Sequence, residues 1–168
     1  TVAALAHDEP ANHYELSRVS TLAERQGDGW VISGAKSVVL FGDQAGLLLV
    51  SARTSGALDD EAGISLFLVP GDAAGLQCRG YGRIDGGHAA ELVFDQVRLG
   101  ADALLGAEGQ GLATLEHAVG YGVLALCAEA VAHQAESEPP AHAGKPLDRV
   151  DGDRRDHRDA AGDGVADG

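Results

Sequence analysis

The chain has 168 residues, of which 45% are hydrophobic, enough to bury a sizeable core in one domain or in one domain with part of another. Its formal net charge of -14 argues against nucleic acid or an anionic membrane surface as a partner, since both need clustered Lys and Arg. Cys78 and Cys127 form no CxxC pair, so neither a disulfide framework nor a zinc site is expected. We expect a reduced, cytoplasmic setting and no membrane span.

Short β-rich runs separated by turn residues fill the first two thirds of the chain. The sequence GDG at 27–29 predicts a turn, and the change of apolar parity at Asp95 and Gln96 predicts a turn or bulge. Two nearly continuous apolar runs, 46–52 and 64–69, predict central strands covered on both faces. The pattern predicts a mainly β fold, an antiparallel barrel-like or orthogonally packed sandwich of about six to eight strands. The predicted strands are 19–23, 30–32, 37–40, 47–51, 64–69, 76–79 and 90–99.

After Gly111 the apolar period changes from two to about 3.6 and predicts one amphipathic helix of about twenty residues. Gly120 and Gly122 lie inside it and weaken it, so tertiary packing must hold it. Without a partner for its apolar side, the helix predicts self-association or poor solubility. The apolar stripe consists of Leu112, Leu115, Val119, Val123, Leu126 and Ala130.

The apolar pattern stops near residue 134. From 134 to 168 the large aliphatic and aromatic residues are Leu147, Val150 and Val165, amid mixed charges, Gly, Ala and Pro. This composition predicts disorder. The expected organisation is therefore a β domain at 1–104, a helix within 105–133 and a disordered tail at 134–168.

Three short segments invite a chemical interpretation. GAEGQG at 106–111 has the order G-x-x-G-x-G with no Lys-Ser or Lys-Thr pair, so a turn before a helix is favoured over a phosphate loop. HDEPANH at 7–13 lacks helical spacing and a third ligand cluster, and is interpreted as a polar loop rather than a metal site. DGDRRDHRD at 151–159 is interpreted as a solvated charge run rather than a calcium loop. No G-x-S-x-G elbow is present.

Five blocks, in order, resemble one known family. GDGWVISGAK, AGLLLVSART, GISLFLV, AAELVFDQVRL and ALLGAEGQGLATLEHAV are similar to the middle domain of the acyl-CoA dehydrogenases and the first helix of their C-terminal domain. The resemblance covers roughly residues 3–131 and includes Gly34 and Lys36 of the family's N-G-x-K block. It implies a flavoprotein that oxidises the Cα–Cβ bond of an acyl-CoA thioester, with FAD accepting the hydride. A carboxylate removes the α-proton in such enzymes.

The resemblance also implies where a flavin would lie. The family's T-E-P segment falls at Asp8, Glu9 and Pro10, and its W-I-T or W-I-S triplet falls at Val38, Val39 and Leu40. These six residues are the expected cofactor-binding residues. Asp8 stands where the family has Thr, and Val38 and Leu40 replace Trp and the hydroxyl residue. We therefore expect flavin contacts from the backbone of an extended strand rather than from these side chains.

Other parts of the family have no match. No segment after Val131 resembles the domain with the catalytic Glu and the R-x-x-F-G segment, and Glu116, Glu129 and Glu136 lie in no family motif. We expect no catalytic base and no metal ligand in this chain, an inactive fragment, and assembly with other dehydrogenase chains. A frameshift near 131–134 is our hypothesis for the tail. A non-catalytic partner subunit, a remnant and an unrelated small β-barrel binding protein remain as alternatives.

Overall fold

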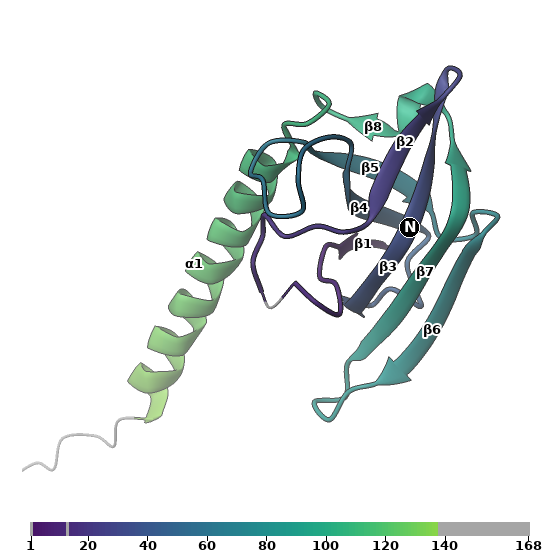
Figure 1. Ribbon diagram of the computed structural model, residues 1–168. Helices are drawn as coiled ribbons and strands as arrows, with labels where there is room; N and C mark the ends of the chain where they lie inside the picture. Colours follow the sequence, from purple (N-terminus) through teal and green to yellow (C-terminus); the bar gives the residue numbers. More distant parts are fainter. Residues whose placement is uncertain (1, 13, 138–168) are drawn as a thin grey trace, which may run out of the picture. The chain divides into compact units, whose positions relative to one another are not determined.

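The computed structural model describes residues 2–12 and 14–137. The chain divides into two units, Thr1–Ala128 and Glu129–Gly168. The sheet and the first part of the helix belong to the first unit, and the described residues of the second continue the helix to Ser137. The elements in Figure 1 are β1 (Ala3–Ala6), β2 (Leu22–Gln26), β3 (Gly29–Leu40), β4 (Leu47–Arg53), β5 (Ile64–Pro70), β6 (Leu76–Gly82), β7 (His88–Leu99), a 3-10 turn (Ala101–Ala103), β8 (Leu104–Leu105) and α1 (Gly111–Ser137).

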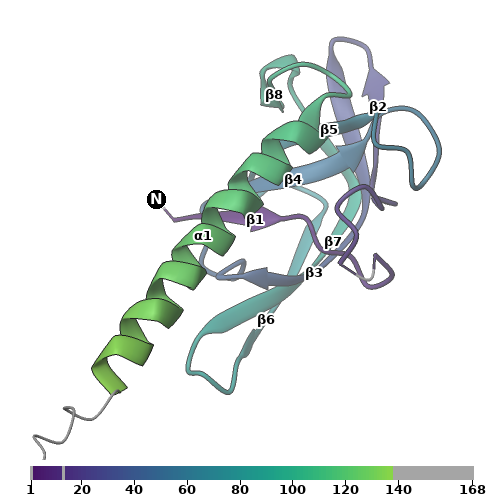
Figure 2. The same cartoon turned by 90° about the vertical axis from the view of Figure 1, so that its left-hand side faces the viewer.

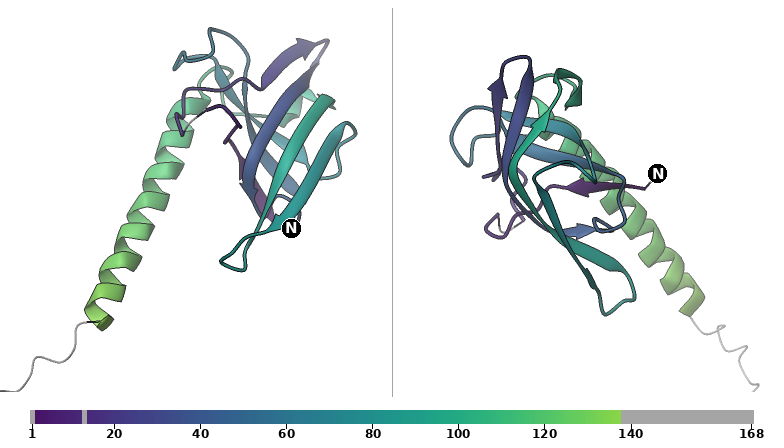
Figure 3. Two further views of the ribbon diagram at one scale, coloured as in Figure 1. Left: turned by 60° about the horizontal axis from the view of Figure 1, so that its bottom comes forward. Right: turned by 90° about the vertical axis from the view of Figure 1, so that its right-hand side faces the viewer.

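The strands form one 8-stranded sheet in the order β6-β7-β3-β2-β4-β5-β8, with β1 added beside β4. Figure 3 shows β6, β7 and β3 as long neighbouring strands along one side of the sheet. Most pairs are antiparallel, which confirms the predicted mainly β architecture. Two pairings are parallel instead, β1 with β4 and the contact of Leu22 with Arg53. The long connection from β1 to β4 allows the parallel pairing, which a tight hairpin would not.

The core lies on the inner face of this curved sheet, where alternate residues point inward. On β4 these are Leu48, Val50 and Ala52, each at most 1% exposed. Trp30 of β3 meets Phe67 of β5 edge-on, with ring centroids 5.1 Å apart. This aromatic pair joins two strands that are not neighbours in the sheet, so it ties its two halves together.

β3 corrects the sequence-based expectation of separate strands at 30–32 and 37–40. The chain continues as one strand through Gly34, whose φ of +151° is a backbone conformation that other residues rarely adopt. A Cβ at this position would also lie 2.7 Å from Thr21 Cα. Register shifts against β7 fall between Ile32 and Gly34 and again between Lys36 and Val39. The first of these is the predicted bulge, since it falls opposite Gln96, whose φ is +54°. β1 and β8 were not predicted. The first consists of four Ala and Leu residues and the second of two Leu residues, so neither is long enough to show an apolar pattern.

α1 runs for 27 residues, longer than the predicted twenty. Its first turns lie over β5 (Figure 2). Leu112 and Leu115 of these turns pack with Ile64 and Leu66 on the outer face of β5. The predicted covering of this strand on both faces is thus confirmed.

Farther along α1, the apolar side chains are exposed. Leu126, for example, is 66% exposed. Gly111–Gln134 is long and apolar enough to cross a membrane, whereas the sequence analysis expected no such segment. Core helices of proteins outside membranes can have the same length and composition. The predicted tail lies outside the described residues, except that 134–137 are helical.

Candidate functional site

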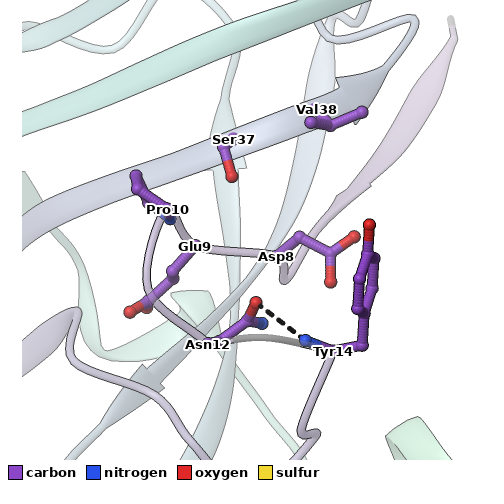
Figure 4. Close-up of a pocket in the computed structure, with 7 residues that line it drawn as sticks. All are labelled: Asp8, Glu9, Pro10, Asn12, Tyr14, Ser37 and Val38. Atoms are coloured by element: carbon purple, nitrogen blue, oxygen red, sulfur yellow. Dashed lines mark hydrogen bonds between the residues drawn. The ribbon is translucent and has the colours of Figure 1, made fainter.

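Two hollows adjoin each other at the C-terminal end of β3. The first, which we call the β3 pocket, has a volume of about 280 Å³ (Figure 4). The second, the α1 groove, has a volume of about 220 Å³. The β3 pocket is lined by Asp8, Glu9, Pro10, Asn12, Tyr14, Ser37 and Val38, and the α1 groove by Leu5, His7, Asp8, Leu16, Ser37, Val38, Leu40 and Val119. Asp8, Ser37 and Val38 line both, so the two hollows share a wall.

The backbone of β3 is bent where it meets these hollows. Val38 has a φ of +52°, rare for a β-branched residue, and it lies inside the register shift between Lys36 and Val39. Its amide is 3.4 Å from Glu91 Oε1 and makes no ladder bond to β7. The bend leaves the Val38 side chain 51% exposed, on the wall shared by both hollows. Such strain persists only where the surroundings enforce it, and it is common at binding sites.

The segment after β1 is held against β3 at this bend. Ser37 donates its backbone N–H to the carbonyl oxygen of Asp8 at 2.8 Å. The two sequence-predicted segments, Asp8 to Pro10 and Val38 to Leu40, therefore meet although they are far apart in the sequence. Leu40 is 48% exposed and lines the α1 groove. Val39 is 2% exposed in the core, so its side chain faces away from both hollows.

The side chain of Glu9 is held inside the protein. Its carboxylate turns inward to Lys36 Nζ at 2.8 Å, with side chains 3% and 0% exposed. It also accepts hydrogen bonds from the Ser20 hydroxyl and from the backbone N–H groups of Ser20, at 2.8 Å, and Thr21, at 3.0 Å. The carboxylate is fully engaged, so Glu9 fixes the shape of the segment and is unavailable to a ligand. Lys36 was not among the predicted site residues, although a Lys in the N-G-x-K block was a usable signal.

The pair has a well-defined charge state. Burial raises the pKa of Glu9, but Lys36 and the hydrogen bonds outweigh it and lower the pKa to about 2. Burial lowers the pKa of Lys36 to about 8, although Glu9 and Asp8 act in the opposite direction. Glu9 is thus ionised and Lys36 protonated at neutral pH. Lys36 Nζ also donates to the His7 carbonyl oxygen and to Ser51 Oγ, each at 3.0 Å.

Two further polar side chains, His7 and Asn12, were missed by the sequence reasoning. His7 is 6% exposed, with Nδ1 2.8 Å from Ser51 Oγ and no partner for Nε2. Burial first, and then Lys36, lower the pKa of His7, so its ring is neutral. Asn12 is 5% exposed and accepts the Tyr14 N–H at Oδ1, while its Nδ2 has no partner. Unpaired buried polar atoms are uncommon, and both residues line a hollow.

The composition of the two hollows favours binding over acid–base or metal chemistry. Asp8 and Glu9 are the carboxylates among their lining residues, and Lys36 occupies Glu9. Among residues 2–12 and 14–137, no three His, Cys, Asp or Glu side chains are grouped so that they could hold a metal ion. What remains is an apolar wall, an irregular strand backbone and two unpaired polar groups. This combination suits a large, partly apolar ligand with a few hydrogen-bonding atoms.

The fold and this site can now be compared with known proteins. A family model described as "Acyl-CoA dehydrogenase, middle domain" matches residues 4–97, more than half of the chain. The chain belongs to the acyl-CoA dehydrogenase family. Acyl-CoA dehydrogenase IpdE1 of Mycobacterium tuberculosis is 37% identical over 123 residues, which cover 70% of this chain and 32% of that protein. The chain thus spans about a third of the length of the curated relatives that it matches.

Solved structures agree with this assignment. A putative acyl-CoA dehydrogenase from Mycobacterium smegmatis superposes with a TM-score of 0.66 at 31% identity, over 70% of this chain and 31% of that one. A protein described as an FAD-dependent dehydrogenase superposes with a TM-score of 0.62 at 30% identity, over 67% of this chain and 31% of that one.

The glycine-rich segment before α1 has a structural role in this family member. The backbone N–H of Gly109 donates to Ser65 Oγ at 2.7 Å, and its carbonyl accepts from Gly63 N at 3.0 Å. These bonds fasten the segment to β5 and its leading turn, so its amides do not form a free cradle for a phosphate. The predicted turn before a helix is confirmed.

Proposed function

We propose that this chain supplies the flavin-facing wall of an FAD-dependent acyl-CoA dehydrogenase, which dehydrogenates an acyl-CoA thioester between its α and β carbons. The observation that supports it is the meeting of the Asp8 to Pro10 segment with Val38 and Leu40 around one pair of hollows. In the acyl-CoA dehydrogenase family, the segments that correspond to these two contact the flavin. Fatty acyl-CoA metabolism in the cytoplasm is part of the same proposal. Cys78 and Cys127 are free, as a reducing compartment requires.

The residues present fit a flavin. An isoalloxazine ring is flat and carries donor and acceptor atoms along one edge. The backbone at Val38 is bent rather than extended as expected, and the bend places an exposed apolar residue on the wall that both hollows share. The unpaired Nε2 of His7 and Nδ2 of Asn12 provide hydrogen-bonding groups beside that wall. When bound, FAD supplies the two-electron redox chemistry. The residues of this chain bind and orient the ring and exclude water from one of its sides.

On its own, we propose, this chain does not turn over substrate. A base that removes the α-proton must approach the substrate from the side opposite the flavin. Asp8 lies on the same wall as the proposed flavin contacts, and Glu9 is paired with Lys36. The β domain at 1–104 and the helix beginning within 105–133 are then one part of a larger active site. Other segments or other dehydrogenase chains would complete that site, and a non-catalytic partner subunit is the second candidate.

The test is to purify the chain, titrate it with FAD, measure the flavin absorbance and fluorescence, and then add an acyl-CoA anaerobically. We expect FAD to bind and the yellow colour to persist after the acyl-CoA is added. Bleaching would overturn the proposed inactivity, and absence of any FAD binding would overturn the flavin site itself.

A pair of variants locates the binding. Val38→Asp places a charge on the shared wall and should abolish FAD binding. Val93→Asp, at a valine on β7 that is 43% exposed, outside both hollows, is the matched control and should leave binding unchanged. Equal effects of the two variants would argue against the site at β3.

A further inference from the structure

The α1 groove has an apolar lining interrupted by one buried histidine. Leu5, Leu16, Leu40 and Val119 surround it, with Val38 at the border with the β3 pocket. His7 lines the groove as well and is 6% exposed. Its Nε2 has no hydrogen-bond partner among the described residues. A buried histidine nitrogen in such a lining needs an explanation, because nearly all buried polar atoms in proteins are paired.

The surrounding hydrogen bonds indicate which nitrogen of His7 bears the proton. Lys36 Nζ is an ammonium group and can only donate, so at 3.0 Å from Ser51 Oγ it uses that oxygen as an acceptor. The single hydroxyl hydrogen of Ser51 is then free to point at His7 Nδ1, 2.8 Å away. Donation to Nδ1 gives this hydrogen an acceptor, which the opposite tautomer does not, so we assign the proton of the neutral ring to Nε2. The hydrogen bonds from Lys36 to Ser51 and from Ser51 to Nδ1 thereby make Nε2–H of His7, a residue that lines the groove, an unpaired donor.

We propose that His7 is a specificity-determining residue whose Nε2–H donates a hydrogen bond to a carbonyl oxygen of the ligand in the α1 groove. The inference rests on the proposed function and goes beyond it by naming a residue that none of the family motifs above contains. The carbonyl belongs either to the flavin ring or to the acyl group of the thioester.

A neutral donor beside Asp8 and a mostly apolar lining disfavour a phosphate, which would need a positive charge. To reach the buried Nε2, the ligand must displace a lining side chain such as Leu16 or Val119, neither of which is fully buried.

The first experiment measures the His7 ring directly. The full chain is labelled with ¹⁵N-histidine, and long-range ¹H–¹⁵N spectra are recorded alone and with FAD, butyryl-CoA or acetoacetyl-CoA. We expect the Nε2–H tautomer in the free chain and a shift of that signal with a ligand whose carbonyl reaches it. A response to FAD identifies the ring carbonyl, a response to both thioesters identifies the thioester carbonyl, and a response to acetoacetyl-CoA alone identifies its additional acyl carbonyl. His117, exposed on α1, is the internal control and should not respond.

The second experiment removes the donor. His7→Phe should weaken binding of the responding ligand about fivefold to tenfold, the effect of one lost neutral hydrogen bond. His7→Gln keeps an N–H donor and should restore part of the affinity, and His117→Phe should change nothing. If His7→Phe does not fold, as judged by circular dichroism, the wild-type spectra decide alone.

The outcomes separate this inference from the proposed function. FAD binding with no response of His7, or with equal affinity for His7→Phe, overturns the inference and leaves the flavin site standing. An Nδ1–H tautomer in the free chain also overturns it. If neither FAD nor either thioester binds, the proposed function fails, and the ligand role of His7 fails with it.

Discussion

Lys36 Nζ lies 2.8 Å from Glu9 Oε1 in a part of the protein where the two side chains are 0% and 3% exposed. The pair joins β3 to the segment that follows β1, and that segment lines the β3 pocket. A buried ion pair is not in itself stabilising compared with an apolar pair, because both charges lose their hydration. Removing one partner, however, leaves the other charge buried and unpaired. The pair therefore makes the geometry of the pocket depend on the lining residue Glu9 and on Lys36, which does not line it.

Breaking this pair should be strongly destabilising. Lys36→Met leaves the Glu9 carboxylate buried without its counter-ion, and we expect a loss of about 3–5 kcal/mol in the free energy of unfolding. Urea denaturation followed by circular dichroism measures it. The double variant Lys36→Met, Glu9→Gln should lose less than Lys36→Met alone, since no charge then remains.

The control for this prediction is an exposed pair. Arg83 and Asp85 form an ion pair with side chains 38% and 51% exposed. Arg83→Ala should therefore change the stability by about 0–1 kcal/mol. If Lys36→Met proves no more harmful than Arg83→Ala, the buried pair does not hold the segment.

Acidification should weaken the fold through Glu9. Its folded-state pKa is about 2 and its unfolded value 4.5, so the unfolded chain binds the proton first as the pH falls. The contribution of Glu9 is fully present above pH 4.5 and is lost progressively between pH 4.5 and about 2. Urea midpoints measured across this window should drop more steeply for the wild type than for Glu9→Gln. Parallel slopes for the two proteins would show that Glu9 is not the titrating group.

Gly34 should tolerate no side chain. Its φ of +151° disfavours other residues, and an added Cβ would lie 2.7 Å from both Cα and Oγ1 of Thr21. Gly34→Ala is expected to destabilise the protein by about 1–3 kcal/mol through strain and overpacking. At Gly120 in α1 a Cβ would meet nothing, so Gly120→Ala should stabilise the helix by up to about 1 kcal/mol. Thermal melts of both variants check this, and a neutral Gly34→Ala would contradict the close approach of β3 to Thr21.

The predictability of the fold from sequence followed the strength of the apolar patterns. β4 and β5 were predicted because their runs are long and strongly apolar, and the bulge near Gln96 because parity changes there. β1 was not predicted, because Ala3–Ala6 is short and pairs with β4, which is far away in the sequence. The continuity of β3 was not predicted, because a glycine at position 34 suggests a turn as long as its contact with Thr21 is unknown. Tertiary contacts, rather than local preference, decided both cases.

The candidate site was predictable in part. The meeting of the Asp8 to Pro10 segment with Val38 and Leu40 was expected only through the family resemblance, because no local pattern links residues so far apart. The inward turn of the Glu9 carboxylate was not expected, since it depends on the reach of Lys36 across the interior. In the sequence His7 belonged to a segment interpreted as a polar loop, and no ligand role was predicted for it. Its importance lies in an unpaired atom, and a missing hydrogen bond cannot be recognised before the neighbours are known.

The exposed apolar residues of α1, which include Tyr121 and Leu124 outside the predicted stripe, should cause self-association. Val123 and Leu126 lie beyond the buried start of the helix and are 53% and 66% exposed, and such surfaces usually meet a partner. In sedimentation velocity, the average sedimentation coefficient of the chain should rise with protein concentration, as expected for self-association. Leu126→Glu should shift the equilibrium toward monomer, because a charge in the contact is costly to desolvate. Glu129→Gln, an exposed change on the same helix, is the control. A wild-type chain that stays monomeric at every concentration would mean that this side of α1 needs no partner.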